Sequence, residues 1–221
     1  MTMSLSSSGG SIRRQNLGEE ILNAISHGVG ALLAIAGLVL LIVKAARYGS
    51  ALNVVSVTIF GAAMIIMYLF SCLYHALADC KGKRVFQVLD HCSIFLLIVG
   101  TYTPICLVNI GGALGWTVFG VNAACAVVGI VLNAVSLKRW KKLSMVLYIV
   151  MGWMCLLVLP WVYRSLTSFG FVFLALGGAA YTVGVLFYRQ KEKRYRHGIW
   201  HFFVLAGTIF HFFTVYTNCC F

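Results

Sequence analysis

The chain has 221 residues, of which 61% are hydrophobic and only 10% are charged. Soluble domains carry roughly a quarter charged residues, so a soluble fold would leave too much apolar surface in water. The 17 Lys and Arg give a net charge of +12, but they lie in short clusters between long apolar stretches. A nucleic-acid-binding surface is therefore excluded, and the composition predicts a protein that crosses the membrane several times.

Residues 1–20 are rich in Ser and Gly and contain no apolar core. They predict a short disordered cytoplasmic tail rather than a signal peptide. The eight cysteines show no C-x-x-C spacing, and most of them fall inside apolar stretches. They therefore predict packing residues, and no disulfide framework or zinc finger follows from them.

From residue 21 onward the chain divides into apolar segments of about 20 residues, the length that a ~30 Å hydrocarbon core requires. The seven segments are 21–43, 52–77, 89–108, 113–135, 144–163, 168–188 and 198–218. The links between them are too short to form an extramembrane domain. The sequence thus predicts an all-α integral membrane protein in which residues 21–221 form a single seven-transmembrane helix bundle.

The basic residues predict how this bundle is oriented. Of the 17 Lys and Arg, 14 lie in the tail and in the second, fourth and sixth links, and three lie on the opposite side. The positive-inside rule then gives a cytoplasmic N-terminus and a C-terminus outside. This arrangement requires an odd number of spans, so the charge asymmetry also supports the count of seven.

The predicted orientation brings residues of metal-ligand type to one depth. His75 ends the second segment, Asp90 begins the third, and His197 and His201 begin the seventh. Side chains four residues apart share one helix face, so His197 and His201 can grip one ion. Three histidines suit Zn²⁺, which keeps an open fourth position when it is catalytic. Asp90 suits a base or an orienting group, and Ser71, one turn before His75, could bond a water molecule or an oxyanion.

Each of these residues also has a simpler interpretation. Asp90 could cap the third helix, and His75 could extend to the lipid headgroups. The pair His197 and His201 could continue the basic sixth link. A metal site is favoured because separate helices bring these residues to the same leaflet, where buried ionisable groups are costly unless they are used.

The other histidines are interpreted differently. His27 lies close to Glu20, and both are expected to support the cluster without binding the ion. His91 points about 100° away from Asp90 on a helix, so the two residues cannot face one ion. His211 lies roughly 15 Å deeper than His201 and is expected to make an interhelical hydrogen bond.

Several motifs occur in a fixed order from Glu19 to the C-terminus. They are Glu19-Glu20-Ile21, Ser26-His27-Gly28, Ser71-Cys72-Leu73-Tyr74-His75, Leu89-Asp90-His91-Cys92 and His197-Gly198-Ile199-Trp200-His201. Together they resemble the hemolysin III family, the bacterial branch of the progestin and adipoQ receptor superfamily. The resemblance covers nearly the whole chain.

The resemblance implies more than the spacing does. The receptor branch holds zinc near the cytoplasmic face through histidines that match His75, His197 and His201. An aspartate matching Asp90 contacts the water on that ion, and a serine matching Ser71 completes the site. Hydrolysis of ceramide-type lipid amides has been attributed to that branch, whereas the family name implies a lytic or pore-forming role. This chain lacks the receptors' folded N-terminal region, which puts hormone binding in doubt.

Two functional hypotheses remain open from the sequence. The first is a zinc-dependent membrane hydrolase that acts on a lipid amide at the cytoplasmic side. The second is a pore-forming or membrane-homeostasis protein with a structural zinc ion. In either case we expect a multi-pass protein of the cell membrane whose partners are membrane lipids, with no nucleic acid or soluble protein partner. A homo-oligomer stays open.

Overall fold

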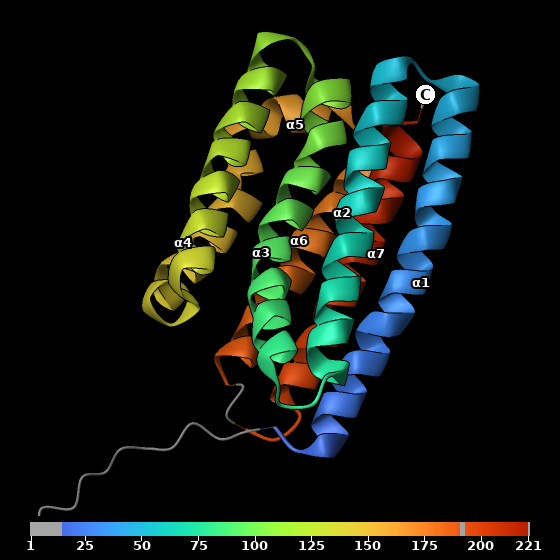
Figure 1. Cartoon of the computed structure of the whole chain (residues 1–221). Coiled ribbons are helices and arrows are strands. Elements are labelled where there is room, and N and C mark those ends of the chain that lie inside the picture. The colour runs from blue at the N-terminus through green and yellow to red at the C-terminus, as the bar shows by residue number, and fades with distance from the viewer. Residues whose placement is uncertain (1–14, 191–192, 221) are drawn as a thin grey trace, which may run out of the picture.

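The computed structural model describes residues 15–190 and 193–220, and the described residues contain helices but no strands. The elements are α1 (Leu17–Tyr48), α2 (Ala51–Ala76), α3 (Lys81–Pro104), η1 (Ile105–Ile110), α4 (Gly112–Gly152), η2 (Met154–Val158), α5 (Leu159–Ser165), α6 (Ser168–Arg189) and α7 (Arg196–Asn218). The long helices run side by side in one bundle, with α1, α2 and α7 along one side and α4 along the other (Figure 1).

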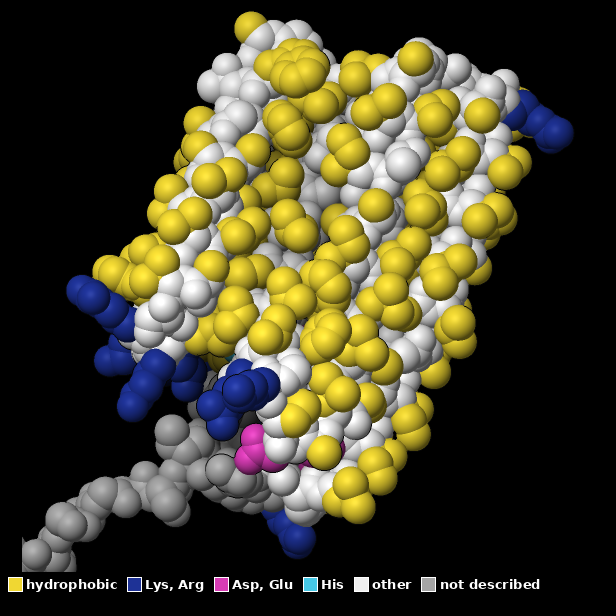
Figure 2. All heavy atoms as spheres, viewed as in Figure 1, with side chains coloured by type: hydrophobic (Ala, Val, Ile, Leu, Met, Phe, Trp, Pro, Cys, Tyr) yellow, Lys and Arg dark blue, Asp and Glu magenta, His cyan; other side chains and the backbone are white. Residues whose placement is uncertain are grey.

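The outside of the bundle is apolar over most of its height. Figure 2 shows hydrophobic side chains over the body and Lys and Arg gathered mainly at one end. Within the described residues, six helical stretches are long and apolar enough to cross a membrane. The chain is therefore an integral membrane protein of helical-bundle type, as its composition predicts. Arg13, Arg14 and Lys191 of the charge count lie outside the described residues.

Helix α1 begins before the end of the expected tail. Asn16 caps the helix, because its side chain accepts a hydrogen bond from the Glu19 backbone N–H at 2.9 Å. The Glu19 carboxylate in turn accepts one from the Asn16 backbone N–H at 3.0 Å. This reciprocal capping box satisfies two free backbone donors, so the helix starts at Leu17 rather than at residue 21. Residues 1–14 of the expected tail lie outside the described residues.

Helix α4 consists of two helices that fold back on each other. Its backbone leaves the helical conformation at Ser136, with φ −166° and ψ 101°. The Asn122 side-chain amide donates to the Met151 carbonyl at 3.2 Å. In a straight helix two residues 29 positions apart would be separated by about 43 Å, so the chain reverses between them. The two halves occupy the predicted segments 113–135 and 144–163, the second continuing through η2 and α5.

A glycine on α7 allows this helix to lie close to α1. A Cβ atom at Gly198 would come within 2.9 Å of Leu22 Cδ2 and 3.1 Å of Asn23 Oδ1. Small residues at such contacts let helix backbones approach, which is how helices associate inside a membrane. Gly198 stands next to His197, so this contact fixes the position of the α7 histidines relative to α1.

Candidate metal centre

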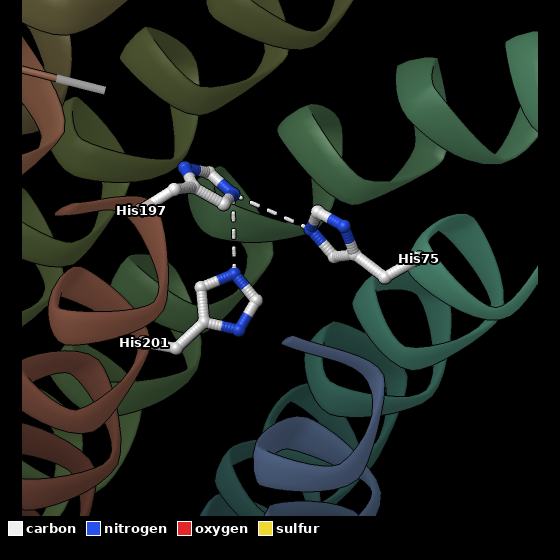
Figure 3. A group of neighbouring side chains, drawn as sticks. All are labelled: His75, His197 and His201. Carbon is white, nitrogen blue, oxygen red and sulfur yellow. Dashed lines mark hydrogen bonds between the residues drawn. The ribbon is translucent and has the colours of Figure 1, made fainter. Parts of the chain in front are cut away.

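Three imidazole rings converge at the end of the bundle where α1 and α7 begin. His75 comes from the last turn of α2, and His197 and His201 come from the first turns of α7 (Figure 3). The His197 Nε2 atom lies 3.3 Å from His75 Nε2 and 3.2 Å from His201 Nε2. Each residue can offer one ligand atom so that all three atoms lie within 4.8 Å of one another. His75 and His201 are 4% and 0% exposed.

These distances fit a tetrahedral metal ion. A Zn–N bond is about 2.0–2.1 Å, so two nitrogen ligands on a regular tetrahedron lie about 3.3 Å apart. The two measured Nε2–Nε2 distances of 3.2 and 3.3 Å match that separation. The three histidines predicted from the sequence therefore form a group that could hold a metal ion.

The outer nitrogens of two rings have partners that orient them. His75 Nδ1 lies 2.6 Å from Glu20 Oε2, and a carboxylate can only accept, so this nitrogen carries the hydrogen. His201 Nδ1 lies 3.3 Å from Ser26 Oγ, whose own hydrogen is donated to the Asn23 carbonyl at 2.9 Å. Ser26 thus accepts from His201. Both rings then turn a lone pair on Nε2 toward the centre, as metal binding requires.

Glu20 is itself held by a basic residue. Lys83 Nζ lies 3.1 Å from Glu20 Oε1 and also donates to the Leu77 carbonyl at 3.0 Å. This ion pair joins the start of α1 to the first turn of α3. It holds the Glu20 carboxylate in place against His75.

His27 packs against the triad without joining it. Its ring stacks on His201 with centroids 3.7 Å apart and an interplanar angle of 17°, and it is 1% exposed. The Tyr68 ring meets it edge-on at 5.1 Å. Glu20 bonds His75 rather than His27. Glu20 thus contacts the His75 ring and His27 stacks on the His201 ring, and the supporting role of both residues stays a prediction.

Asp90 and Ser71 lie in the surrounding structure rather than in the triad. Asp90 is 5% exposed on α3, and its Oδ2 atom lies 3.4 Å from His91 Nδ1. Ser71 is 1% exposed on α2, one turn before His75. His91 lies outside the group of His75, His197 and His201 that could hold a metal ion, and its side chain reaches Asp90. The catalytic roles of Asp90 and Ser71 stay predictions.

A cavity of about 450 Å³ opens beside the triad. His197 and Asp90 line it at one end, and it extends between α3, α4, α6 and α7 to Tyr102 and His211. Its walls are mainly apolar and aromatic, and they include Leu97, Ile98, Met145, Ile149, Trp153, Tyr181, Val185, Trp200 and Val204. Apolar walls with few polar groups are typical of sites for small hydrophobic molecules.

Fold and site together define a class: a multi-pass helical membrane protein with a buried three-histidine group next to an apolar cavity. The sequence model of the family described as Haemolysin-III related matches residues 15–212. The chain belongs to this family.

Individual relatives agree with the family match. The chain is 45% identical over 201 residues to a protein called Hemolysin-3 homolog from Bacillus subtilis (strain 168), covering 91% of this chain and 94% of that protein. It is 42% identical over 197 residues to Hemolysin-3 of Bacillus cereus, covering 89% and 90%. A distant relative is the human monocyte to macrophage differentiation factor, 23% identical over 168 residues, covering 72% and 68%. No solved structure matches the chain.

Sequence reasoning missed two residues that serve the triad. Ser26 orients His201 and Lys83 holds Glu20, but neither was expected to contribute. Ser26 stands directly before His27 in a motif of the family, which was a usable signal. The sequence identifies Lys83 only as one of the basic residues that set orientation, and its position after the second apolar segment does not indicate an ion pair.

Proposed function

We propose that this protein is a zinc-dependent hydrolase of a membrane lipid, acting on an amide-type linkage. The observation that carries the proposal is that His197 and Asp90 stand in the wall of the apolar cavity. A lipid whose chain fills the cavity would bring its polar linkage to the triad. The cavity volume of about 450 Å³ lies within the usual range for small-molecule sites.

Each residue has a defined task in this proposal. His75, His197 and His201 hold the ion, while Glu20 and Ser26 keep two of the rings in the binding tautomer. When bound at such a site, Zn²⁺ supplies Lewis-acid chemistry that activates water and polarises a carbonyl group. A neighbouring carboxylate can take the proton that the attacking water loses, and we assign this role to Asp90.

The composition of the triad favours a catalytic ion over a structural one. Within the described residues, the group that could hold a metal contains three protein ligands. Structural zinc sites in proteins almost always have four protein ligands, whereas catalytic sites have three and leave one position for water or substrate. The three-ligand group therefore favours the hydrolase over the alternative, a pore with a structural zinc ion. That alternative is suggested by the word hemolysin in the relatives' names.

We also propose seven spans with a cytoplasmic N-terminus. The two antiparallel halves of α4, joined near Ser136, count as separate spans, which raises six apolar stretches to seven. The clusters of Lys and Arg at the end that carries the triad support a cytoplasmic location for that end (Figure 2). The metal centre would then work at the inner leaflet.

The substitution Asp90→Asn tests the hydrolase. We expect purified protein in detergent to keep its bound zinc and to lose turnover of a fluorescent ceramide-type amide by about 10²-fold or more, the usual contribution of a general base. Released fatty acid and zinc content are measured on the same samples. Unchanged turnover would contradict the mechanism, and lytic activity retained by a zinc-free triad variant would favour the pore.

A further inference from the structure

The far end of the cavity contains a buried histidine that the proposed reaction does not use. His211 lies on α7 ten residues beyond His201, which places it about 15 Å further along the helix. It is 8% exposed and lines the same cavity as His197 and Asp90. A polar side chain at this depth in a membrane protein is costly unless its hydrogen-bonding groups are used.

One edge of the His211 ring is held by α6. Its Nε2 atom lies 3.3 Å from the Leu174 carbonyl oxygen, which can only accept, so Nε2 carries the hydrogen. A side chain at Gly177 would overlap His211 Cδ2 and Nε2, so the ring occupies the space that the glycine leaves. This contact confirms the expected interhelical hydrogen bond and fixes the ring against α6.

The other ring nitrogen, Nδ1, does not contact the Leu174 carbonyl. His211 Nδ1 is buried and has no hydrogen-bond partner within residues 15–190 and 193–220. It lies on the half of the ring opposite the Cδ2–Nε2 edge that faces α6. A neutral imidazole that donates through Nε2 has its lone pair on Nδ1, so this atom is an acceptor. The hydrogen bond to Leu174 explains how His211 joins α7 to α6, but it does not explain why Nδ1 is a buried acceptor without a partner in the described residues.

A second acceptor stands beside it. The Tyr181 ring lies 5.3 Å from the His211 ring, and both residues line the cavity. The Tyr181 hydroxyl is 2.7 Å from Thr208 Oγ1, which donates its own hydrogen to the Val204 carbonyl at 3.0 Å. The Tyr181 hydroxyl therefore donates to Thr208 Oγ1. The lone pairs of the Tyr181 oxygen are not used in this bond and can accept a further hydrogen bond.

We propose that His211 Nδ1 recognises a hydrogen-bond donor, most simply a hydroxyl group, carried within the apolar chain of the bound lipid. The protein would then prefer lipids hydroxylated in the middle of the chain over unsubstituted ones. This inference rests on the proposed function only in taking the cavity as the lipid site with the polar end of the lipid at the triad. It does not require that the lipid be hydrolysed.

The depth of His211 selects the probes. An extended chain advances about 1.2 Å per bond, so 15 Å corresponds to roughly 12 bonds from a group at the triad. We therefore compare 12-hydroxyoctadecanoate with octadecanoate, and use 2-hydroxyoctadecanoate as a positional control. Each acid displaces a fluorescent fatty acid from zinc-loaded protein in detergent. The measured quantity is the ratio of affinities for the hydroxylated and the plain acid.

We expect His211→Phe to lower this ratio for the 12-hydroxy acid by about tenfold, the effect of one buried hydrogen bond. The affinity for octadecanoate and the ratio for the 2-hydroxy acid should not change. Thr214→Val is the matched control, because Thr214 also lies on α7 and donates to a carbonyl of α6, that of Gly170, at 3.1 Å. It should keep the wild-type ratio.

Zinc content serves as the folding check, and His211→Ala replaces His211→Phe if the latter does not keep its zinc. The same ratio in wild type and His211 variant would overturn the inference, and so would binding of neither acid by the wild type. Failure of the hydrolase would appear separately, as absent amide turnover in a protein that still shows the His211-dependent ratio.

Discussion

At the scale of single residues, we expect Glu20 to have the clearest effect on the proposed metal binding. Its carboxylate accepts from His75 Nδ1 at 2.6 Å and is paired with Lys83 at 3.1 Å. Replacing it with a neutral amide keeps an acceptor but removes the charge that makes His75 a stronger ligand. We expect Glu20→Gln to weaken zinc affinity by about 10–100-fold, the usual effect of losing such a partner. Competition with a chelator measures it.

Glu19 provides a matched control for this change. It stands next to Glu20 but caps α1 and accepts from the Tyr195 backbone N–H at 2.7 Å. The amide oxygen of Gln can still accept a backbone hydrogen bond and position 19 does not contact a ligand histidine through these hydrogen bonds, so Glu19→Gln should leave zinc affinity as it is. A triple alanine variant of His75, His197 and His201 gives the metal-free reference. Zinc bound one-to-one by that variant would show that the site is elsewhere.

The sequence predicts which residues of the site share a depth, but not how their side chains pair. His197 and His201 follow from a four-residue spacing, and His75 follows from its place at the end of a segment. The partner of His75 is 55 residues away in α1, and Ser26 is 175 residues from His201. Such pairs depend on how each helix is rotated about its axis. Hydropathy gives the length of a span, and the rotation is decided by packing.

At the scale of helices, the contact between α1 and α7 positions the triad. Gly198→Val would place a branched side chain where even a Cβ atom comes within 2.9 Å of Leu22. We expect α7 to move away from α1, with a loss of about 1–3 kcal/mol of stability and lower zinc occupancy. Gly198→Ala should cost less, because the nearest atom is the end of a flexible side chain.

The matched control for this change is Gly120→Val on α4, where an added Cβ meets nothing within 4 Å. Thermal unfolding in detergent and zinc per protein are measured for all three variants. Equal losses in Gly198→Val and Gly120→Val would mean that branching in the helix, rather than the α1–α7 contact, is responsible.

The sequence predicts the existence of each long helix better than the residues at which the helix begins and ends. Hydropathy locates the apolar part of a helix, whereas the helix itself continues while its backbone hydrogen bonds can be made. Helix α3 therefore begins at Lys81, well before the predicted 89–108, and ends at Pro104, followed by the π-helical turns of η1. Proline lacks a backbone N–H, which interrupts the regular α-helical pattern there.

At the scale of the whole molecule, one end of the bundle combines the three-histidine group with most of the basic residues, and this asymmetry makes the orientation testable. Cys80 is an exposed free cysteine at the start of α3, on the same end as the triad. If that end is cytoplasmic, a membrane-impermeant thiol reagent should label Cys80 only after the membrane is permeabilised. Cys80→Ser gives the background from the other cysteines.

The opposite end supplies the complementary measurement. Arg164 is exposed in the last turn of α5, and the predicted topology puts it outside. In the Cys80→Ser background, Arg164→Cys should react with the impermeant reagent in intact cells, without permeabilisation. The reverse pattern, with Cys80 labelled in intact cells and position 164 protected, would mean that the metal centre faces outward. The proposed hydrolase would then act on lipids of the outer leaflet.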